Sequence, residues 1–278
     1  MKAATEISSE LRALSDSAQA ANLSRFFKCG KGDYGEGDLF LGVRVPDTRA
    51  IVKRYWKGAA TEDVDLLTRS PYHEERLAGF LTLVELYTHE KKKKRDADPE
   101  TLVNFYLSIM DRGNNWDLVD LVAPKILGDY LLAHPHLQPL LFQLSSSGNL
   151  WKERVSIVAT LPIIKSGDFS LTLDLAMLLA PHPHDLIHKA TGWMLREVGK
   201  KNQRTLQNFL DRHCTELSRT TLSYATERLE ERRRISYRLQ LNEAITTRLT
   251  GKAPAHIPMT RKVSSIKPVK KNSNTQKK

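Results

Sequence analysis

Apolar residues at helical spacing run through almost the whole chain, and this periodicity restricts its possible folds more than any other feature. Within residues 72–88, leucine, phenylalanine and valine recur at i, i+3, i+4 and i+7, and residues 202–212 repeat part of that pattern. Such spacing places the apolar side chains on one face of a helix. Sustained alternation of apolar and polar residues, which would indicate a strand, is found nowhere. The sequence therefore predicts an all-α protein.

Helix-start signals divide the chain into many short helices. Proline and acidic residues favour the first turn of a helix, and asparagine favours the position before it. Pro46-Asp47 and Thr61-Glu62-Asp63 each predict a start, and Asn114-Asn115 predicts another just before Trp116. The one Gly-rich stretch, residues 29–38, lacks the spacing and the strand-before, helix-after context of a phosphate-binding loop. We interpret it as a connecting loop.

A weak internal repeat links four of the helical segments. They can be laid over one another at offsets of 35 to 43 residues, with these residues equivalent: Arg76, Val119, Arg154 and Lys189. That period is typical of helix pairs stacked as an α-solenoid of HEAT-like repeats, in which each pair buries its apolar face against the next. The inner helices of such a stack line one concave surface, which suits a rod-shaped partner such as duplex DNA.

The net charge of +11 is unevenly distributed. Residues 252–278 contain eight basic residues and no acidic one, so they account for most of this excess. This segment is rich in Pro, Ser, Asn and Lys and has few residues able to form a core, which is typical of disorder. We predict a repeat domain over residues 1–250 and a disordered basic tail over residues 251–278. Composition does not distinguish a tail that binds nucleic acid from one that only aids solubility.

Several classes of protein are excluded. No apolar run approaches the roughly 18 residues that cross a bilayer, and the first residues lack the apolar stretch of a secretory signal. Cys29 and Cys214 are the only cysteines, too few for a disulfide framework. We therefore expect a cytoplasmic protein with reduced thiols that does not associate with membranes.

The tryptophans, and the arginines near them, can be interpreted in two ways. Trp151 and Trp193 each have an arginine three residues later, Arg154 and Arg196, on the same helix face. In the structural interpretation, which residue spacing alone favours, the indole packs between helices and the arginine covers it. In the functional interpretation, flat rings and phosphate-binding guanidinium groups line the concave wall.

Asp120 is the most unusual acidic residue. It lies one helical turn after Trp116 and has apolar neighbours on both sides in sequence, whereas Asp117 is explained by the dipole of the helix that begins there. A carboxylate beside an indole on a basic surface would stabilise a cation. The alternative is a solvent-exposed charge, which the spacing alone slightly favours.

The histidines give only a weak indication of a metal site. His182, His184 and His188 lie close in sequence, but the first two flank a proline in an apparent turn, and no matching set of cysteines or carboxylates accompanies them. We expect no metal and no cofactor.

Four motifs together resemble the AlkD-type DNA alkylation repair glycosylases, which are built from HEAT-like repeats. The resemblance covers about residues 5–240, and the motifs follow in the order and at the spacings of that family. They are Phe40-Leu-Gly-Val-Arg-Val-Pro46, Asn114-Asn-Trp-Asp-Leu-Val-Asp120, Leu150-Trp-Lys-Glu-Arg154 and Lys189-Ala-Thr-Gly-Trp-Met-Leu-Arg196-Glu.

This resemblance implies roles for several residues. Asp120 is similar to the family's catalytic carboxylate, Trp116 and Trp193 to the tryptophans that pack against the deoxyribose of the lesion, and Arg154 to an active-site arginine that contacts the DNA backbone. The family's tyrosine near the N-terminal helices has no counterpart, because Phe26-Phe27 occupies that stretch. The longer loop that follows contributes Tyr34. Two alternatives stay open: Tyr34 replaces the contact of the family's tyrosine, or the rings of Phe26 and Phe27 suffice without a hydroxyl.

The sequence thus predicts a monomeric, monofunctional DNA glycosylase that hydrolyses the N-glycosidic bond of N3- or N7-alkylated purines, such as 3-methyladenine and 7-methylguanine, in double-stranded DNA. Besides the residues named above, Arg76, Lys189 and Arg196 are predicted to bind DNA. One alternative is a non-catalytic HEAT-like protein that binds damaged or branched DNA. A second is a scaffold for other proteins, which would have an apolar or acidic concave face.

Overall fold

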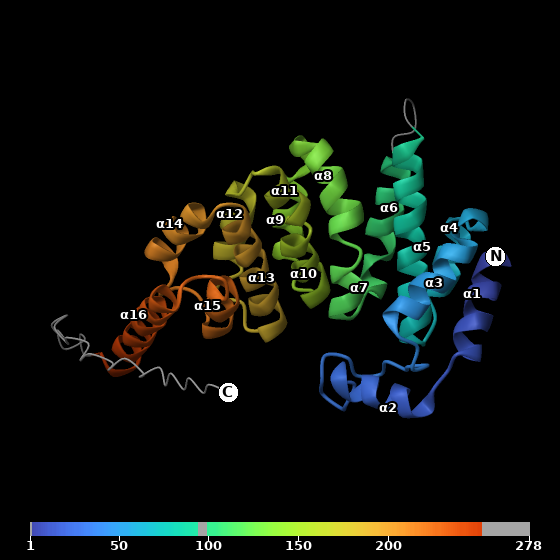
Figure 1. Ribbon diagram of the computed structural model, residues 1–278, viewed down its shortest axis with the longest axis horizontal. Coiled ribbons are helices and arrows are strands. Elements are labelled where there is room, and N and C mark those ends of the chain that lie inside the picture. Colours follow the sequence, from blue (N-terminus) through green and yellow to red (C-terminus); the bar gives the residue numbers. More distant parts are fainter. Residues whose placement is uncertain (1, 94–98, 252–278) are drawn as a thin grey trace, which may run out of the picture.

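The chain forms a row of short helices in the computed structural model, which describes residues 2–93 and 99–251 (Figure 1). The predicted basic tail lies outside these residues apart from Gly251. The first half contains α1 (Lys2–Ala13), α2 (Ser17–Phe26), α3 (Val45–Tyr55), η1 (Trp56–Gly58), α4 (Thr61–Thr68), α5 (His73–Lys92), α6 (Glu100–Ile109), η2 (Met110–Arg112), α7 (Trp116–Asp120), η3 (Pro124–Gly128) and α8 (Asp129–Ala133). The second half contains η4 (Pro135–Leu137), α9 (Pro139–Ser145), α10 (Leu150–Val158), α11 (Leu161–Ser166), α12 (Ser170–Leu178), α13 (Asp185–Lys201), α14 (Gln203–His213), α15 (Arg219–Thr226) and α16 (Glu231–Thr250).

The all-α prediction is confirmed: the described residues contain no strand, only an isolated bridge between Leu39 and Tyr72. The predicted helix starts are also found. Pro46 lies in the first turn of α3, and Thr61 is the first residue of α4. None of the described helices is long and apolar enough to cross a membrane.

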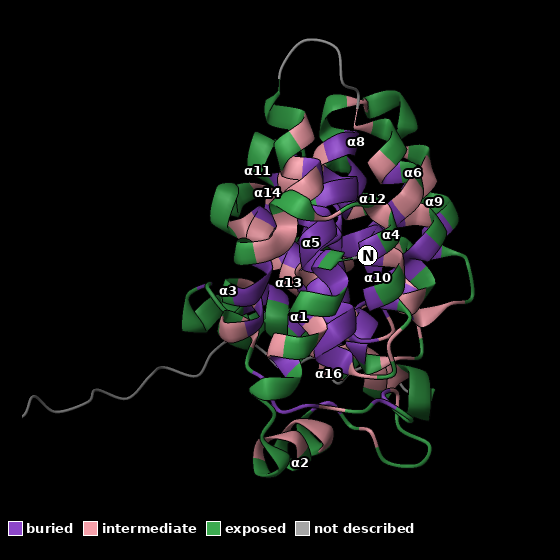
Figure 2. Ribbon diagram, turned by 90° about the vertical axis from the view of Figure 1, so that its right-hand side faces the viewer, coloured by how far each residue is buried: buried purple, intermediate pink, exposed green. Residues whose placement is uncertain are grey.

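The predicted repeat corresponds to helices that pack against one another in succession. Its four equivalent positions lie in α5, α7, α10 and α13, and α15 follows α13 in the same layer. Helices such as α4, α6, α9, α11 and α12 pack behind them. The protein is therefore a solenoid of helical repeats, with buried residues between the layers and exposed residues outside (Figure 2).

Two apolar clusters form the core. The larger extends from Ala4 in α1 to Val198 in α13. The smaller extends from Ala176 in α12 to Leu241 in α16. Because α12 and α13 contribute to both, these helices connect the two halves of the solenoid.

One glycine shows how closely α13 and α15 pack. A Cβ atom at Gly192 would lie 2.5 Å from the Cβ of Tyr224 and 2.6 Å from the carbonyl oxygen of Thr221. No side chain fits at that distance. Glycine inside a helix costs about 1 kcal/mol of helix stability relative to alanine. Here the absence of a side chain at Gly192 allows α13 and α15 to come into close contact.

Candidate active site

A cavity of about 450 Å³ opens where α2 and the loop after it face the helices of the inner layer. In Figures 1 and 2 the helix α2 lies below the row of helices, and Figure 1 shows α15 at the lower side of that row. The cavity is lined by Phe26, Lys28, Tyr34, Trp116, Asp120, Arg154, Leu186, Lys189, Trp193, Arg196 and Tyr224. Of the seven residues that the sequence singled out for catalysis or binding, six line this cavity, and Arg76 does not.

Asp120, the last residue of α7, forms a two-pronged ion pair with Arg154 of α10. Arg154 donates from Nε to Oδ1 at 2.8 Å and from Nη2 to Oδ2 at 2.7 Å. The side chains are 13% and 6% exposed, respectively. Arg154 also donates from Nη1 to the carbonyl oxygen of Leu186 at 2.5 Å, which fixes the guanidinium between three helices. The alternative of a solvent-exposed charge at Asp120 is wrong.

Burial raises the pKa of Asp120 above the ordinary aspartate value, although the positive charge and hydrogen bonds of Arg154 act in the opposite direction. The nearby carboxylate of Asp117 raises the pKa further. Perturbed acids of this kind are concentrated at functional sites, because a poorly hydrated carboxylate interacts strongly with any cation that approaches it.

Trp116 precedes Asp120 in the sequence and Trp193 follows it, and both side chains line the cavity. The ring of Trp116 stacks on Phe27, with centroids 5.2 Å apart and planes 23° apart, and meets the edge of Phe26 at 6.0 Å. Trp193 donates from its indole nitrogen to Glu197 at 3.1 Å. Each indole is thus fixed from behind while part of it remains exposed.

The other two tryptophans do not line the cavity. Trp151 belongs to the larger apolar cluster, with 9% of its surface exposed. For this residue the interpretation as a packing residue is confirmed. The structural interpretation also assumed that Arg154 covers Trp151. Instead, the guanidinium group of Arg154 is ion-paired with Asp120.

The N-terminal aromatic residues have separate positions. Phe26 and Tyr34 line the cavity, whereas Phe27 is buried behind Trp116. Burial raises the pKa of the Tyr34 hydroxyl, and the neighbouring indole of Trp116 acts in the opposite direction. The Gly-rich segment is a loop, as predicted, and it brings a phenolic hydroxyl into the cavity.

Two basic side chains complete the wall. Lys189 is 41% exposed and pairs with Asp185 at 2.9 Å. Arg196 pairs with Glu227 through one terminal nitrogen, while its buried Nε has no partner among the described residues. Both therefore line the cavity with carboxylate partners of their own.

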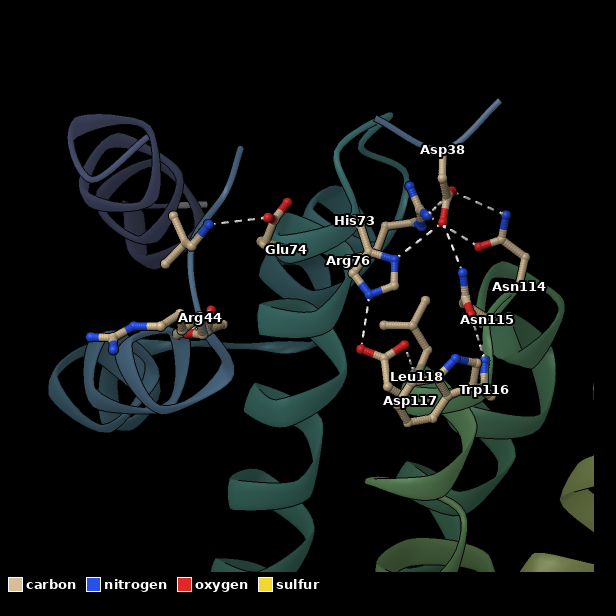
Figure 3. Close-up of polar contacts among 12 residues, drawn as sticks. Asp38, Arg44, His73, Glu74, Arg76, Asn114, Asn115, Trp116, Asp117 and Leu118 are labelled. Carbon is tan, nitrogen blue, oxygen red and sulfur yellow. Dashed lines mark hydrogen bonds and ion pairs between the residues drawn. The ribbon is translucent and has the colours of Figure 1, made fainter. Parts of the chain in front are cut away.

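Arg76 has a different position from the one predicted. Its side chain is 8% exposed, and it is ion-paired with Asp38 and donates to the carbonyl oxygen of Ser70 at 3.0 Å and to Asn114 at 3.1 Å (Figure 3). Because these groups occupy its guanidinium below the surface, this placement does not favour a contact with DNA. The sequence repeat predicted the helix position of Arg76 but not the residues that surround its side chain.

A buried polar network that the sequence did not reveal surrounds Arg76. His73 lies between two carboxylates, with Nδ1 at 3.1 Å from Asp38 and Nε2 at 2.9 Å from Asp117 (Figure 3). Burial lowers the pKa of His73, but the two carboxylates outweigh it and raise the pKa to about 9. Asp117 therefore does more than interact with the helix dipole, because it joins the start of α7 to α5.

The adjacent Glu74 holds the loop before α3. Its carboxylate accepts hydrogen bonds from the backbone amides of Leu41 at 2.9 Å, Gly42 at 2.9 Å and Val43 at 3.2 Å. A sequence signal for this network exists only in retrospect: His73 and Glu74 are polar residues at positions that the helical period assigns to the interior, whereas Asp38, in a loop, gives no such signal.

The histidines after α12 have structural partners. His182 lies 2.9 Å from Glu153, and His184 accepts from the amide of Leu186 at 3.1 Å at the start of α13. In the described part of the chain, no group of three or more His, Cys, Asp or Glu side chains is arranged to hold a metal ion.

A second cavity, of about 390 Å³, adjoins the first. Its lining is almost entirely apolar, and it shares Phe26, Trp116 and Asp120 with the first cavity. Asp120 thus borders both cavities, of which the second is the more apolar.

Comparison with known proteins gives an independent indication of the function. A family model described as "DNA alkylation repair enzyme" matches residues 7–229. Among solved structures, the chain is similar to a "Predicted DNA alkylation repair enzyme from Enterococcus faecalis", with 18% sequence identity, a TM-score of 0.63, and coverage of 78% of this chain and 97% of that one. At this identity the likeness shows the fold. No curated protein matches the chain.

The family match covers most of the chain, including α7, α10 and α13, which carry the motifs quoted above, and it confirms the resemblance. The chain belongs to the DNA alkylation repair enzyme family, and it acts in the repair of alkylated DNA.

Proposed function

We propose that this protein is a monofunctional DNA glycosylase that hydrolyses the N-glycosidic bond of N3- or N7-alkylated purines in duplex DNA. The observation that carries the proposal is the position of Asp120: a poorly hydrated carboxylate, oriented by Arg154, in a cavity with two indole rings. The proposed chemistry requires a negative charge at a point where a cation forms.

The substrate supplies part of the driving force. A purine alkylated at N3 or N7 carries a positive charge, so its bond to the sugar is already weakened and the base leaves as a neutral molecule. No general acid is then needed, and one carboxylate is sufficient where most glycosidases use two. The reaction requires only water, which agrees with the expectation that no cofactor takes part.

The cavity residues can then be assigned roles. As the bond breaks, positive charge develops on the deoxyribose, and Asp120 stabilises it. Asp120 then positions the attacking water and accepts the proton that the water loses when its oxygen bonds to the sugar. Trp116 and Trp193 place their π faces beside the sugar, where they attract the same charge. Lys189 and Arg196 bind the flanking phosphates. Arg154 is assigned here to positioning Asp120, and Arg76 to structure.

One observation favours a second candidate, a non-catalytic protein that binds damaged or branched DNA. Both oxygens of Asp120 are occupied by Arg154, and a carboxylate that stays fully paired has less charge to offer a sugar cation. The same experiment distinguishes the two candidates.

The test is the release of free base from duplex DNA methylated at guanine N7. The intact protein should release 7-methylguanine well above the spontaneous rate, and Asp120→Asn should slow release by about 100-fold or more, as expected when charge stabilisation in the transition state is lost. Liquid chromatography with mass spectrometry measures the released base. The DNA strand should remain intact until it is treated with alkali.

The matched control is Asp174→Asn, which removes an exposed carboxylate of α12. It should leave the rate unchanged. Binding of Asp120→Asn to the same duplex, and its thermal melting, show whether the variant is folded. Release at equal rates by Asp120→Asn and the unmodified protein, or no release by either, would exclude the enzyme and leave the binding protein.

A further inference from the structure

The last helix differs from the rest of the solenoid. α16 begins after residue 229, where the family match ends, so it is an addition to the region shared with the family. It is 20 residues long and contains five arginines and two glutamates. Only Tyr237 and Leu241 are buried, and they anchor the helix in the smaller apolar cluster. The remaining surface is exposed or partly exposed and strongly basic.

A groove of about 500 Å³ runs between α15 and α16. We call it the arginine groove, after Arg219 from α15 and Arg234 and Arg238 from α16, which line it. Glu231 is the one carboxylate in its lining, and it pairs with Arg234 at 2.8 Å. Within residues 2–93 and 99–251, neither Arg219 nor Arg238 has a carboxylate partner. The groove therefore has an excess of positive charge, with three arginines against one glutamate.

The arginine groove and the candidate active site share one short helix. Tyr224 of α15 lines the cavity that contains Asp120, while Leu222 and Ser223 of the same helix line the groove. α15 has only eight residues, and Tyr224 directly follows Ser223, so the two sites border the same short helix. In Figures 1 and 2, α16 lies on the same side of the molecule as α2.

We propose that the arginine groove binds the phosphate backbone of the DNA substrate on one flank of the damaged nucleotide. The guanidinium group binds phosphate oxygens with two parallel hydrogen bonds, and it is always charged. The proposal rests on DNA as the substrate and not on the glycosylase reaction, so its test measures binding to undamaged DNA.

The test uses the full chain and a fluorescein-labelled undamaged duplex of about 20 base pairs, long enough to fill both sites. The triple variant Arg219→Gln/Arg234→Gln/Arg238→Gln should bind this duplex about tenfold more weakly than the unmodified protein at low salt. Each lost phosphate contact reduces the slope of log affinity against log salt by about 0.9, so the slope should fall by about 2 to 3. Fluorescence anisotropy from about 50 to 200 mM salt measures both quantities.

The matched control removes the same charge from the opposite edge of the molecule. Lys165→Gln/Arg204→Gln/Arg212→Gln changes exposed residues of α11 and α14, which lie at the upper side of Figure 1. This variant should bind almost as the unmodified protein does. Equal weakening by both triple variants would mean that net charge, and not the groove, determines the effect, and would overturn the proposal.

A second arm separates DNA from an anionic membrane as the partner. Vesicles of phosphatidylglycerol and phosphatidylcholine replace the duplex in a sedimentation assay. If the groove variant loses vesicle binding but keeps its affinity for DNA, the groove is a membrane site and the proposal is wrong. Loss of base release by Asp120→Asn, with DNA affinity retained, tests the proposed function separately.

Discussion

Asp120 is subject to two opposing electrostatic influences. Burial stabilises its protonated form, while Arg154, 2.7 to 2.8 Å away, stabilises the charged form. Burial is the larger effect, so the pKa is raised. A raised pKa means that the carboxylate, and any activity that needs it, is present at high pH and is lost as the pH falls through that value, earlier than for an ordinary aspartate.

This balance predicts how the rate depends on pH. In the proposed glycosylase, single-turnover release of 7-methylguanine should fall on the acid side with one ionisation, at a pH above the ordinary aspartate value. Arg154→Gln removes the positive charge that lowers the pKa of Asp120, so its acid limb should lie at higher pH than that of the unmodified protein. Base release measured from about pH 5 to 8 tests both expectations.

Arg154→Lys is the control for this prediction. It keeps a positive charge beside Asp120 but not the two-pronged geometry, so its acid limb should stay closer to that of the unmodified protein even if its rate falls. An acid limb that does not move in Arg154→Gln would show that another group controls the pH dependence.

At the scale of elements, the position of α7 depends on a contact with α5. The imidazole of His73 joins Asp117, in the first turn of α7, to Asp38 in the loop after α2 (Figure 3). α7 also carries Trp116 and Asp120, so this contact sets where two of the candidate catalytic residues lie. Because α7 has only five residues before the chain changes to the π-helical segment η3, it has little helical structure of its own to keep it in place.

His73 should make the stability of the protein depend on pH. Its pKa is about 9 in the folded protein, against 6.5 for an ordinary histidine. A pKa raised on folding adds stability that is fully present below pH 6.5 and is lost as the pH rises through 9. His73→Gln should lower the free energy of unfolding by about 3 kcal/mol at pH 6, because it leaves Asp117 buried without a cation and Asp38 with Arg76 alone. The free energy of unfolding of His73→Gln should also decline less between pH 6.5 and pH 9 than that of the unmodified protein.

Urea denaturation at several pH values measures this effect. His136→Gln, at an exposed position after α8, is the matched control and should unfold as the unmodified protein does. A decline in stability that is equally steep in His73→Gln would contradict the role assigned to the imidazolium.

The elements that sequence predicted well are those whose signals are local. Pro46, Thr61 and Asn115 mark helix starts because each acts within one turn of its own helix. The repeat could also be predicted from the sequence, because its equivalent residues lie in neighbouring helices. For the same reason the sequence placed Asp120 and Arg154 in adjacent repeats, although it did not show that they touch.

The elements that sequence did not predict depend on distant partners. Arg76 is predicted from the sequence to bind DNA, but its side chain is buried because Asp38, from a loop 38 residues earlier, pairs with it. The break after Asp120 has a different cause. Pro124 has no amide hydrogen to continue the helix, and the amide of Gly128 bonds five residues back to Ala123 at 2.9 Å.

At the scale of the whole molecule, residues 2–93 and 99–251 contain two apolar clusters that meet in α12 and α13. In a solenoid each repeat contacts only its neighbours, so stability is approximately a sum of local terms. Damage to one cluster should therefore remain in that half of the chain, except where the shared helices transmit it.

Leu210→Ala tests this expectation. Leu210 of α14 is fully buried in the smaller cluster, and its loss should cost about 2 to 5 kcal/mol. Hydrogen exchange should show reduced protection of the amides in α14 to α16, with α4 to α6 unchanged. The control Leu249→Ala, at a side chain of α16 that is 80% exposed, should change neither half. A uniform loss of protection along the chain would indicate a single cooperative unit.

The close packing at Gly192 has a consequence for molecular recognition. With Tyr224 and the backbone of Thr221 already in contact with α13, α15 has no room to move towards α13, and the wall that carries Trp193 and Tyr224 is rigid on this side. A ligand that enters the cavity meets a fixed template. On this side of the cavity, any adjustment needed for a close fit must therefore come from the ligand or from the opposite wall, which contains Phe26 and Tyr34.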